Sequence, residues 1–233
     1  MRDDMHFLSS EQVRAIADQP TPHKVAASED VWSGRIVDLV EDRVVVVEGE
    51  EPVVRQYTRH PGAVAVVVMR GEAGAEEILL ERQYRHPVRA SLWEIPAGLL
   101  DIPGEDPLVA AERELAEEAD LSAERWDTLV DFYTSPGGST EPIRVFLARD
   151  LAPTGTTFER EDEEATMEYA WVSLTDAMEW VLAGRLHNPS TVIGIMAAHA
   201  ARGRCSRGLR EPGATGLVAC QLIGHKSLDM WVV

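Results

Sequence analysis

Three glutamates between residues 114 and 118 are the residues in this sequence whose type and spacing best suit chemistry. Glu114, Glu117 and Glu118 are spaced i, i+3 and i+4, so a helix would place them on one face. Like charges at this spacing destabilise a helix unless a positive charge offsets them. Carboxylate oxygens are the ligands that a hard cation such as Mg²⁺ prefers. The spacing therefore indicates either a metal-binding face or, as is usual for glutamate-rich helices, a solvated face.

The helix that would present these carboxylates carries clear local signals. Asp106 offers an N-cap acceptor, and Pro107 suits the first helical position. From Leu108 to Ala119 the chain is rich in alanine, leucine, glutamate and arginine, which are good helix formers. The apolar residues of this stretch recur at helical spacing. We therefore expect a helix that packs its apolar side on a core.

The string around this helix closely resembles the signature of the Nudix hydrolases. That signature is a glycine, five residues, a glutamate, seven residues, and then Arg-Glu-U-x-Glu-Glu-x-Gly-U, where U is aliphatic. Gly98, Glu105 and the run from Arg113 to Leu121 match it, with two departures. Six residues follow Gly98 instead of five, which a loop tolerates. Asp120 replaces the second glycine, and aspartate accepts left-handed backbone better than most residues.

The resemblance implies both an activity and a set of site residues. Nudix enzymes cleave a nucleoside diphosphate linked to another group by attack of water on phosphorus. It implies that Mg²⁺, or else Mn²⁺, binds to the carbonyl of Ala97 and the carboxylates of Glu114, Glu117 and Glu118. It also implies that Glu105 pairs with Arg113 and fixes the loop that Gly98 begins to the helix. The alternative for Glu105 and Arg113 is an ordinary surface ion pair.

Residues outside the signature resemble the ADP-ribose pyrophosphatase subfamily. Pro136 lies 16 residues after Asp120, where that subfamily carries proline. The segments from Gln83 to Arg85 and from Trp93 to Gly98 also look like its members. Pro136 would then mark the substrate site, although a proline could equally just shape the turn.

Arg85 is the candidate phosphate clamp, because a guanidinium fork matches phosphate oxygens. The alternative is a salt bridge made by an arginine on an edge strand. Glu94 and Glu141 are the candidates for contacts to substrate hydroxyl groups.

A catalytic base is expected outside the helix, because Glu118 and its neighbours would be committed to metal. The segment from Glu159 to Glu164 is long and acidic, which suits a mobile loop that closes over the site. In ADP-ribose pyrophosphatases a glutamate of the corresponding loop acts as base. Counting back from Met167 assigns this role to Glu163, with Glu164 as the neighbouring alternative. A solvated charge run is the other interpretation of this segment.

Composition restricts the partners of this chain. Its 233 residues carry a formal net charge of −18, which argues against nucleic acid because phosphate backbones need basic surfaces. The first residues lack the pattern of a signal peptide, and no apolar run is long enough to span a membrane. Cys205 and Cys220 form no zinc-binding pattern. We expect a cytoplasmic protein that acts on a small molecule, without a membrane or nucleic-acid partner.

The first 58 residues are expected to form a small antiparallel β meander. Strands are predicted at residues 31–39, 43–48 and 53–58, with Glu41–Asp42 as the tight turn between the first two. Such a meander is too small to be stable alone. It must pack on the core or on a second subunit, and the resemblance to ADP-ribose pyrophosphatases implies a homodimer.

The Nudix domain itself is expected over residues 59–203. Five strands and two further helices are predicted around the signature helix, the strands at 63–69, 77–83, 128–133, 143–148 and 167–172 and the helices at 174–183 and 188–202. This order lacks βαβ alternation and favours a mixed sheet with helices on both faces. The resemblance implies the α/β/α sandwich of the Nudix fold, in the α/β class. Residues 204–233 show little periodicity and are predicted to be a poorly ordered tail.

The function expected from this sequence is Mg²⁺-dependent hydrolysis of ADP-ribose to AMP and ribose 5-phosphate. One alternative is a Nudix hydrolase that acts on another nucleoside diphosphate sugar. The other is a catalytically silent Nudix module that binds nucleotides as a sensor.

Overall fold

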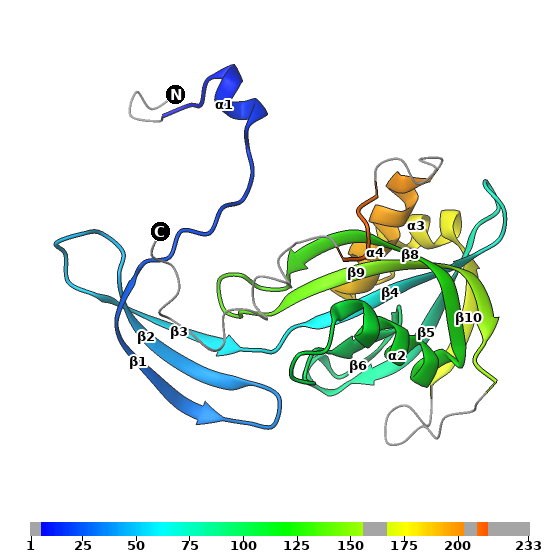
Figure 1. Ribbon diagram of the computed structural model, residues 1–233, viewed down its shortest axis with the longest axis horizontal. Helices are drawn as coiled ribbons and strands as arrows, with labels where there is room; N and C mark the ends of the chain where they lie inside the picture. The colour runs from blue at the N-terminus through cyan, green and yellow to red at the C-terminus, as the bar shows by residue number, and fades with distance from the viewer. Residues whose placement is uncertain (1–5, 156–166, 203–208, 214–233) are drawn as a thin grey trace.

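The computed structural model describes residues 6–155, 167–202 and 209–213 and contains two separate β-sheets (Figure 1). A short helix, α1 (Ser10–Arg14), stands apart from both sheets near the start of the chain. The first sheet has three strands, and the second has seven strands and carries the other helices. The small sheet confirms the antiparallel meander expected near the start of the chain.

The three-stranded sheet is antiparallel, in the order β1-β2-β3. Its strands are β1 (Lys24–Ser33), β2 (Asp38–Val45) and β3 (Val53–Arg59). The turn predicted at Glu41–Asp42 is wrong, because both residues lie inside β2. The chain instead turns at Gly34, whose N–H donates to the Val37 carbonyl at 2.9 Å.

Cross-strand partners explain why two adjacent acids are tolerated within β2. The Tyr57 hydroxyl donates to Asp42 at 3.0 Å, and the Gln56 amide donates to Glu41 at 2.8 Å. A Cβ atom on Gly34 would lie 2.4 Å from the Trp32 ring, so glycine suits this turn on steric grounds. The acidic pair therefore predicted the turn at the wrong place, and the chain turns where Gly34 leaves room for the Trp32 ring.

The larger sheet is mixed, as predicted. Its main path runs β10-β5-β4-β9-β8, while β6 pairs with β5 and β7 with β4. The pairing of β4 with β9 is parallel, and the other strand pairs are antiparallel. The strands are β4 (Ala63–Arg70), β5 (Glu77–Arg85), β6 (Ala90–Glu94), β7 (Ala97–Leu99), β8 (Leu121–Tyr133), β9 (Pro142–Pro153) and β10 (Glu168–Ser173). A short 3₁₀ turn, η1 (His86–Val88), joins β5 to β6.

The sheet opens between β4 and β5. These two strands are paired only where Met69 faces Ile78 and Arg70 faces Glu77. Away from that end, β7 takes the place beside β4, and β6 takes the place beside β5. At the opening, β7 lies against α2 (Pro107–Ala119), the helix that carries the three predicted metal-binding glutamates.

Helices cover both faces of the larger sheet, which confirms the expected α/β architecture. Along β4, Val64, Val66 and Val68 pack into the core on the side of α2. The alternate residues Ala65 and Val67 pack on the side of α3 (Leu174–Leu182) and α4 (Pro189–Ala201). Because successive side chains of a strand point to opposite faces, one apolar strand serves both cores.

A short segment after α4 lies along β8. Arg210 donates to the Asp131 carboxylate at 2.9 Å, and its carbonyl accepts the backbone N–H of Thr128 at 2.9 Å. This segment, residues 209–213, belongs to the stretch 204–233 that was predicted to be a poorly ordered tail. The remainder of that stretch lies outside the described residues.

The two sheets meet at the turn between β8 and β9. The backbone N–H of Thr58 donates to the Gly138 carbonyl at 2.9 Å, and the Thr58 carbonyl accepts from Thr140 at 3.0 Å. The last residues of β3 are thereby fixed to the turn that carries Pro136.

None of the helices in the described part of the chain is long and apolar enough to cross a membrane.

Candidate active site

The helix α2 begins and ends as its sequence predicts. The Asp106 carboxylate accepts the backbone N–H of Leu108 at 2.8 Å, and Pro107 occupies the first helical turn. Asp120 adopts a left-handed conformation, with φ of 54°, at the position where the family signature has glycine. The substitution therefore preserves the backbone conformation that the signature glycine would provide.

Arg113 lies at the centre of the acidic residues of this region. It makes a two-pronged ion pair with Glu105, with Nε to Oε1 at 3.1 Å and Nη2 to Oε2 at 3.0 Å. Its Nη1 also donates to Glu114 at 2.6 Å and to Glu117 at 3.3 Å. The bond to Glu105, against the effect of burial and together with the charge of Glu114, raises the pKa of Arg113 above its usual value. The expected pairing of Glu105 with Arg113 is thus present, and its role in orienting the loop stays a prediction.

Glu114 and Glu118 are one turn apart on α2, and both lie against β7. The Ala97 backbone N–H donates to Glu118 Oε2 at 3.0 Å, and Glu118 is only 7% exposed. A Cβ atom on Gly98 would lie 1.9 Å from the Glu114 carboxyl carbon, so only glycine leaves room for that side chain. The first glycine of the signature therefore has a steric role against the first of the three glutamates.

The donor set fits a hard divalent cation by its chemistry. The side chains of Glu114, Glu117 and Glu118 offer carboxylate oxygens, which a hard cation prefers. Gly98 provides the space in which the Glu114 carboxylate lies. In the described residues no three acidic, histidine or cysteine side chains already converge as a metal site. Arg113 Nη1 instead donates to one oxygen of Glu114 and one oxygen of Glu117.

Arg85 and Glu94 form a pair at the ends of β5 and β6. Arg85 Nε lies 3.0 Å from Glu94 Oε1, and its Nη2 lies 2.7 Å from Oε2. The Glu94 side chain is 2% exposed, whereas that of Arg85 is 43% exposed. Burial acts to lower the pKa of Arg85, but its bonds with Glu94 and the nearby charges of Glu118 and Glu81 raise it. Arg85 therefore makes the salt bridge that was the alternative to a phosphate clamp. The partly exposed guanidinium of Arg85 also lies close enough to Glu118 for its charge to act on it.

Pro136 and Glu141 belong to a second group, at the turn between β8 and β9. Pro136 is exposed in that turn. Glu141 accepts the Thr134 hydroxyl at 2.6 Å, and its other oxygen lies 3.7 Å from His60 Nε2. Burial lowers the pKa of His60, and the charge of Glu141 opposes this. These residues are joined to β3 through the backbone, and their contacts with substrate stay predictions.

The residues predicted to act as base, Glu163 and Glu164, lie outside the described residues. Sequence reasoning also missed two side chains next to the site. Glu81 is 2% exposed and faces Glu94 across β5 and β6. The Tyr169 hydroxyl donates to the Glu118 carbonyl at 2.7 Å. Neither belongs to a motif, and only the register of the sheet brings them near α2.

The chain belongs to the Nudix family, whose NUDIX domain matches residues 59–190. Among curated relatives, the ADP-ribose pyrophosphatase of Mycobacterium tuberculosis is 41% identical over 174 residues, covering 75% of this chain and 82% of the relative. The ADP-ribose pyrophosphatase of Bacillus subtilis and the methanol dehydrogenase activator of Bacillus methanolicus are each 36% identical, over 74% of this chain and 90% of the relative.

A solved structure supports the fold. The crystal structure of an ADP compounds hydrolase superposes with a TM-score of 0.64 and 20% sequence identity. The match covers 81% of this chain and all of that chain. At this identity the match speaks for the fold alone.

Proposed function

We propose that this protein hydrolyses the diphosphate of ADP-ribose to AMP and ribose 5-phosphate. The observation that carries the proposal is the 41% identity to a relative named ADP-ribose pyrophosphatase, over most of both chains. The signature carboxylates on α2 support it, because none of the three is replaced. A catalytically silent module would be expected to lack one or more of them.

In the proposed reaction a water oxygen attacks one phosphorus, and the bond from that phosphorus to the bridging oxygen breaks. Each product keeps one phosphate, and the proton of the water passes to a base. Glu114, Glu117, Glu118 and the Ala97 carbonyl would hold Mg²⁺ or Mn²⁺. Bound there, the cation would neutralise the charge of the diphosphate. This is also how an acidic protein can accept an anionic substrate.

The chain's own residues would then orient substrate. Arg85 uses Nε and Nη2 for Glu94, so Nη1 of its partly exposed guanidinium faces no hydrogen-bond partner from the described residues. We assign to this edge the clamping of a phosphate oxygen. Glu94 and Glu141 would contact substrate hydroxyl groups, with Pro136 shaping the turn beside Glu141.

A hydrolysis panel tests the substrate assignment directly. The purified protein is incubated with Mg²⁺ and, in separate reactions, ADP-ribose, GDP-mannose, other sugar nucleotides, NADH, dinucleoside polyphosphates and 8-oxo-dGTP. ADP-ribose should give the highest kcat/KM, with AMP and ribose 5-phosphate as products. A higher kcat/KM for another sugar nucleotide would favour the first alternative. Nucleotide binding without turnover of any compound would favour the silent module.

The catalytic base is proposed to be Glu163, with Glu164 as the neighbouring alternative. Glu163→Gln should lower kcat by about 100-fold or more, the scale expected for loss of a general base, with little change in KM. Steady-state kinetics on ADP-ribose measures both. A loss in Glu164→Gln but not in Glu163→Gln would move the assignment by one residue. Full activity in both variants would place the base outside this segment.

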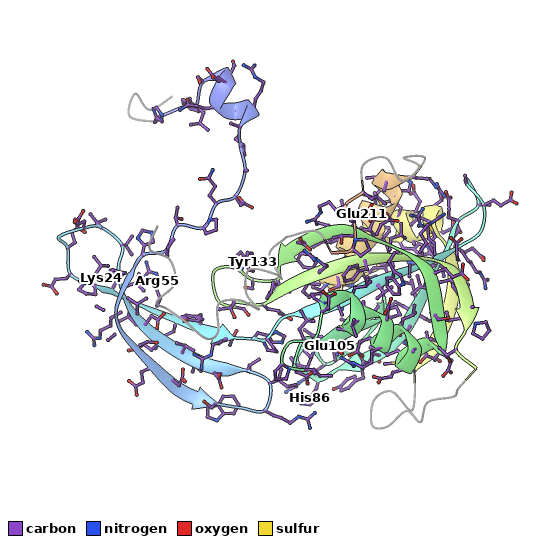
Figure 2. All side chains as sticks on the ribbon, viewed as in Figure 1. Lys24, Arg55, His86, Glu105, Tyr133 and Glu211 are labelled. Carbon is purple, nitrogen blue, oxygen red and sulfur yellow. The ribbon has the colours of Figure 1, made fainter. Side chains whose placement is uncertain are left out.

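We also propose that the three-stranded sheet pairs two subunits in a homodimer. Trp32 on β1 lies opposite Leu39 on β2, and their exposed fractions are 58% and 38%. The sheet stands away from the larger body, as the labelled residues Lys24 and Arg55 show in Figure 2. Contiguous exposed apolar side chains of this kind mark interaction surfaces, and a second copy of the sheet offers a matching apolar face.

An obligate interface of this type would bury about 2,000 Å² or more, so the dimer should persist at micromolar concentration. Light scattering should give twice the mass of the chain for the wild type, and Leu39→Glu should shift it to monomer. Leu182→Glu is the matched control, since Leu182 is 66% exposed at the end of α3. A monomeric wild type at this concentration would refute the proposal.

A further inference from the structure

The last turn of α2 is tied to two other segments of the chain. Carbonyl groups at the end of a helix have no partner within the helix itself. The Glu118 carbonyl accepts the Tyr169 hydroxyl of β10 at 2.7 Å. The Asp120 carbonyl accepts the backbone N–H of Thr154, just after β9, at 3.0 Å. Two separate segments therefore fix one end of the helix.

Glu118 is the residue held at both its backbone and its side chain. Its carbonyl is bound by Tyr169 on β10, and its carboxylate accepts the Ala97 N–H of β7. β10 pairs with β5 and β7 pairs with β4, so the two contacts come from the strands on either side of the opening. A change in the backbone at Glu118 would therefore also displace its carboxylate from Ala97.

Tyr169 also belongs to the row of residues that crosses the sheet beneath the site. It faces Glu81 in the pairing of β10 with β5, and Glu81 faces Glu94 in the pairing of β5 with β6. Directly opposed residues project to the same face of a sheet. The row therefore leads from Tyr169 to the pair of Glu94 and Arg85, on the face that α2 covers.

We propose that Tyr169 is a positioning residue for Glu118, holding the end of α2 so that the Glu118 carboxylate keeps its orientation. The inference rests on the proposed function, in which Glu118 is a metal ligand. Tyr169 acts through the Glu118 backbone and has no contact with the reacting atoms. The hydroxyl of Tyr169 makes this contact, and phenylalanine would keep the rest of the side chain.

Tyr169→Phe removes this hydroxyl alone. Mn²⁺ added without substrate and followed by electron paramagnetic resonance should bind about 3- to 10-fold more weakly, the scale of one hydrogen bond. With ADP-ribose, kcat should fall while KM stays unchanged. The Ala97 amide resonance in a ¹⁵N spectrum should shift without metal. Tyr57→Phe is the matched control and should change none of the three, since the Tyr57 hydroxyl donates to Asp42 within the separate three-stranded sheet.

A double-mutant cycle separates the inference from the proposed function. In a Glu118→Gln background, adding Tyr169→Phe should not weaken Mn²⁺ binding further, because its effect passes through the Glu118 carboxylate. An additional loss of equal size there would overturn the positioning role. If Glu118→Gln alone leaves Mn²⁺ binding unchanged, Glu118 is not a metal ligand, and that part of the proposed function is refuted. The Ala97 resonance then decides on Tyr169, and an unshifted resonance in Tyr169→Phe rejects the inference.

Discussion

Replacing Glu118 by glutamine is expected to lower hydrolysis of ADP-ribose at least about 100-fold while the protein still folds. Glutamine has the same shape, and its carbonyl oxygen can still accept the Ala97 N–H that Glu118 now accepts at 3.0 Å. The negative charge that a divalent cation requires is lost. Steady-state kinetics over a range of Mg²⁺ concentrations measures the effect, and circular dichroism checks the fold.

Glu112 provides the control for this variant. It lies on α2 as well but is exposed to solvent, so Glu112→Gln makes the same change of charge away from the site. Its activity should match the wild type. Turnover close to the wild type in Glu118→Gln, at any Mg²⁺ concentration, would remove Glu118 from the metal ligands.

Replacing Arg85 by methionine is expected to lower the free energy of unfolding by about 3 kcal/mol, because it leaves a buried carboxylate without its partner. The Glu94 side chain is 2% exposed, which places the pair among buried ion pairs. Arg85 is 43% exposed, and solvent screening therefore keeps the effect at the lower end for such pairs. Urea denaturation measures this difference.

Two further variants distinguish the structural role of Arg85 from its role toward substrate. Arg82 lies on β5 like Arg85, and Arg82→Met breaks an exposed pair with Glu168 of β10, so it should cost less than about 1 kcal/mol. Arg85→Lys keeps the charge and much of the stability but loses the planar fork, so KM for ADP-ribose should rise. An unchanged KM in Arg85→Lys would reject the phosphate clamp. Equal losses of stability in Arg85→Met and Arg82→Met would reject the buried pair.

Local signals made α2 predictable in full. Its N-cap, its proline and the left-handed aspartate at its end each act within a few residues of one another, and the structure confirms all three. The three glutamates followed from spacing along the same helix. The pairing of Glu105 with Arg113 was also accessible, because the signature fixes the loop and the helix in one continuous string.

Features that depend on strand register could not be predicted in the same way. The strand expected to begin at Thr128 begins at Leu121, because Ala123 and Trp126, which pack on the core, are three residues apart and do not show the two-residue alternation of a strand. Tyr169 carries no signal of its own, and its contact with Glu118 follows from the position of β10 beside β5.

The segment that lies along β8 has a consequence for the behaviour of shortened chains. β8 is the outermost strand at one side of the larger sheet, and strands in that position can recruit strands of other molecules. The backbone N–H of Thr128 is already bound by Arg210, whose guanidinium also caps Asp131. A chain that stopped after α4 would expose this amide. Asp131 would lose its bond with Arg210 and keep the one with Arg144. Such a chain is expected to self-associate more readily through β8, because residues 209–213 would no longer cover this part of the strand.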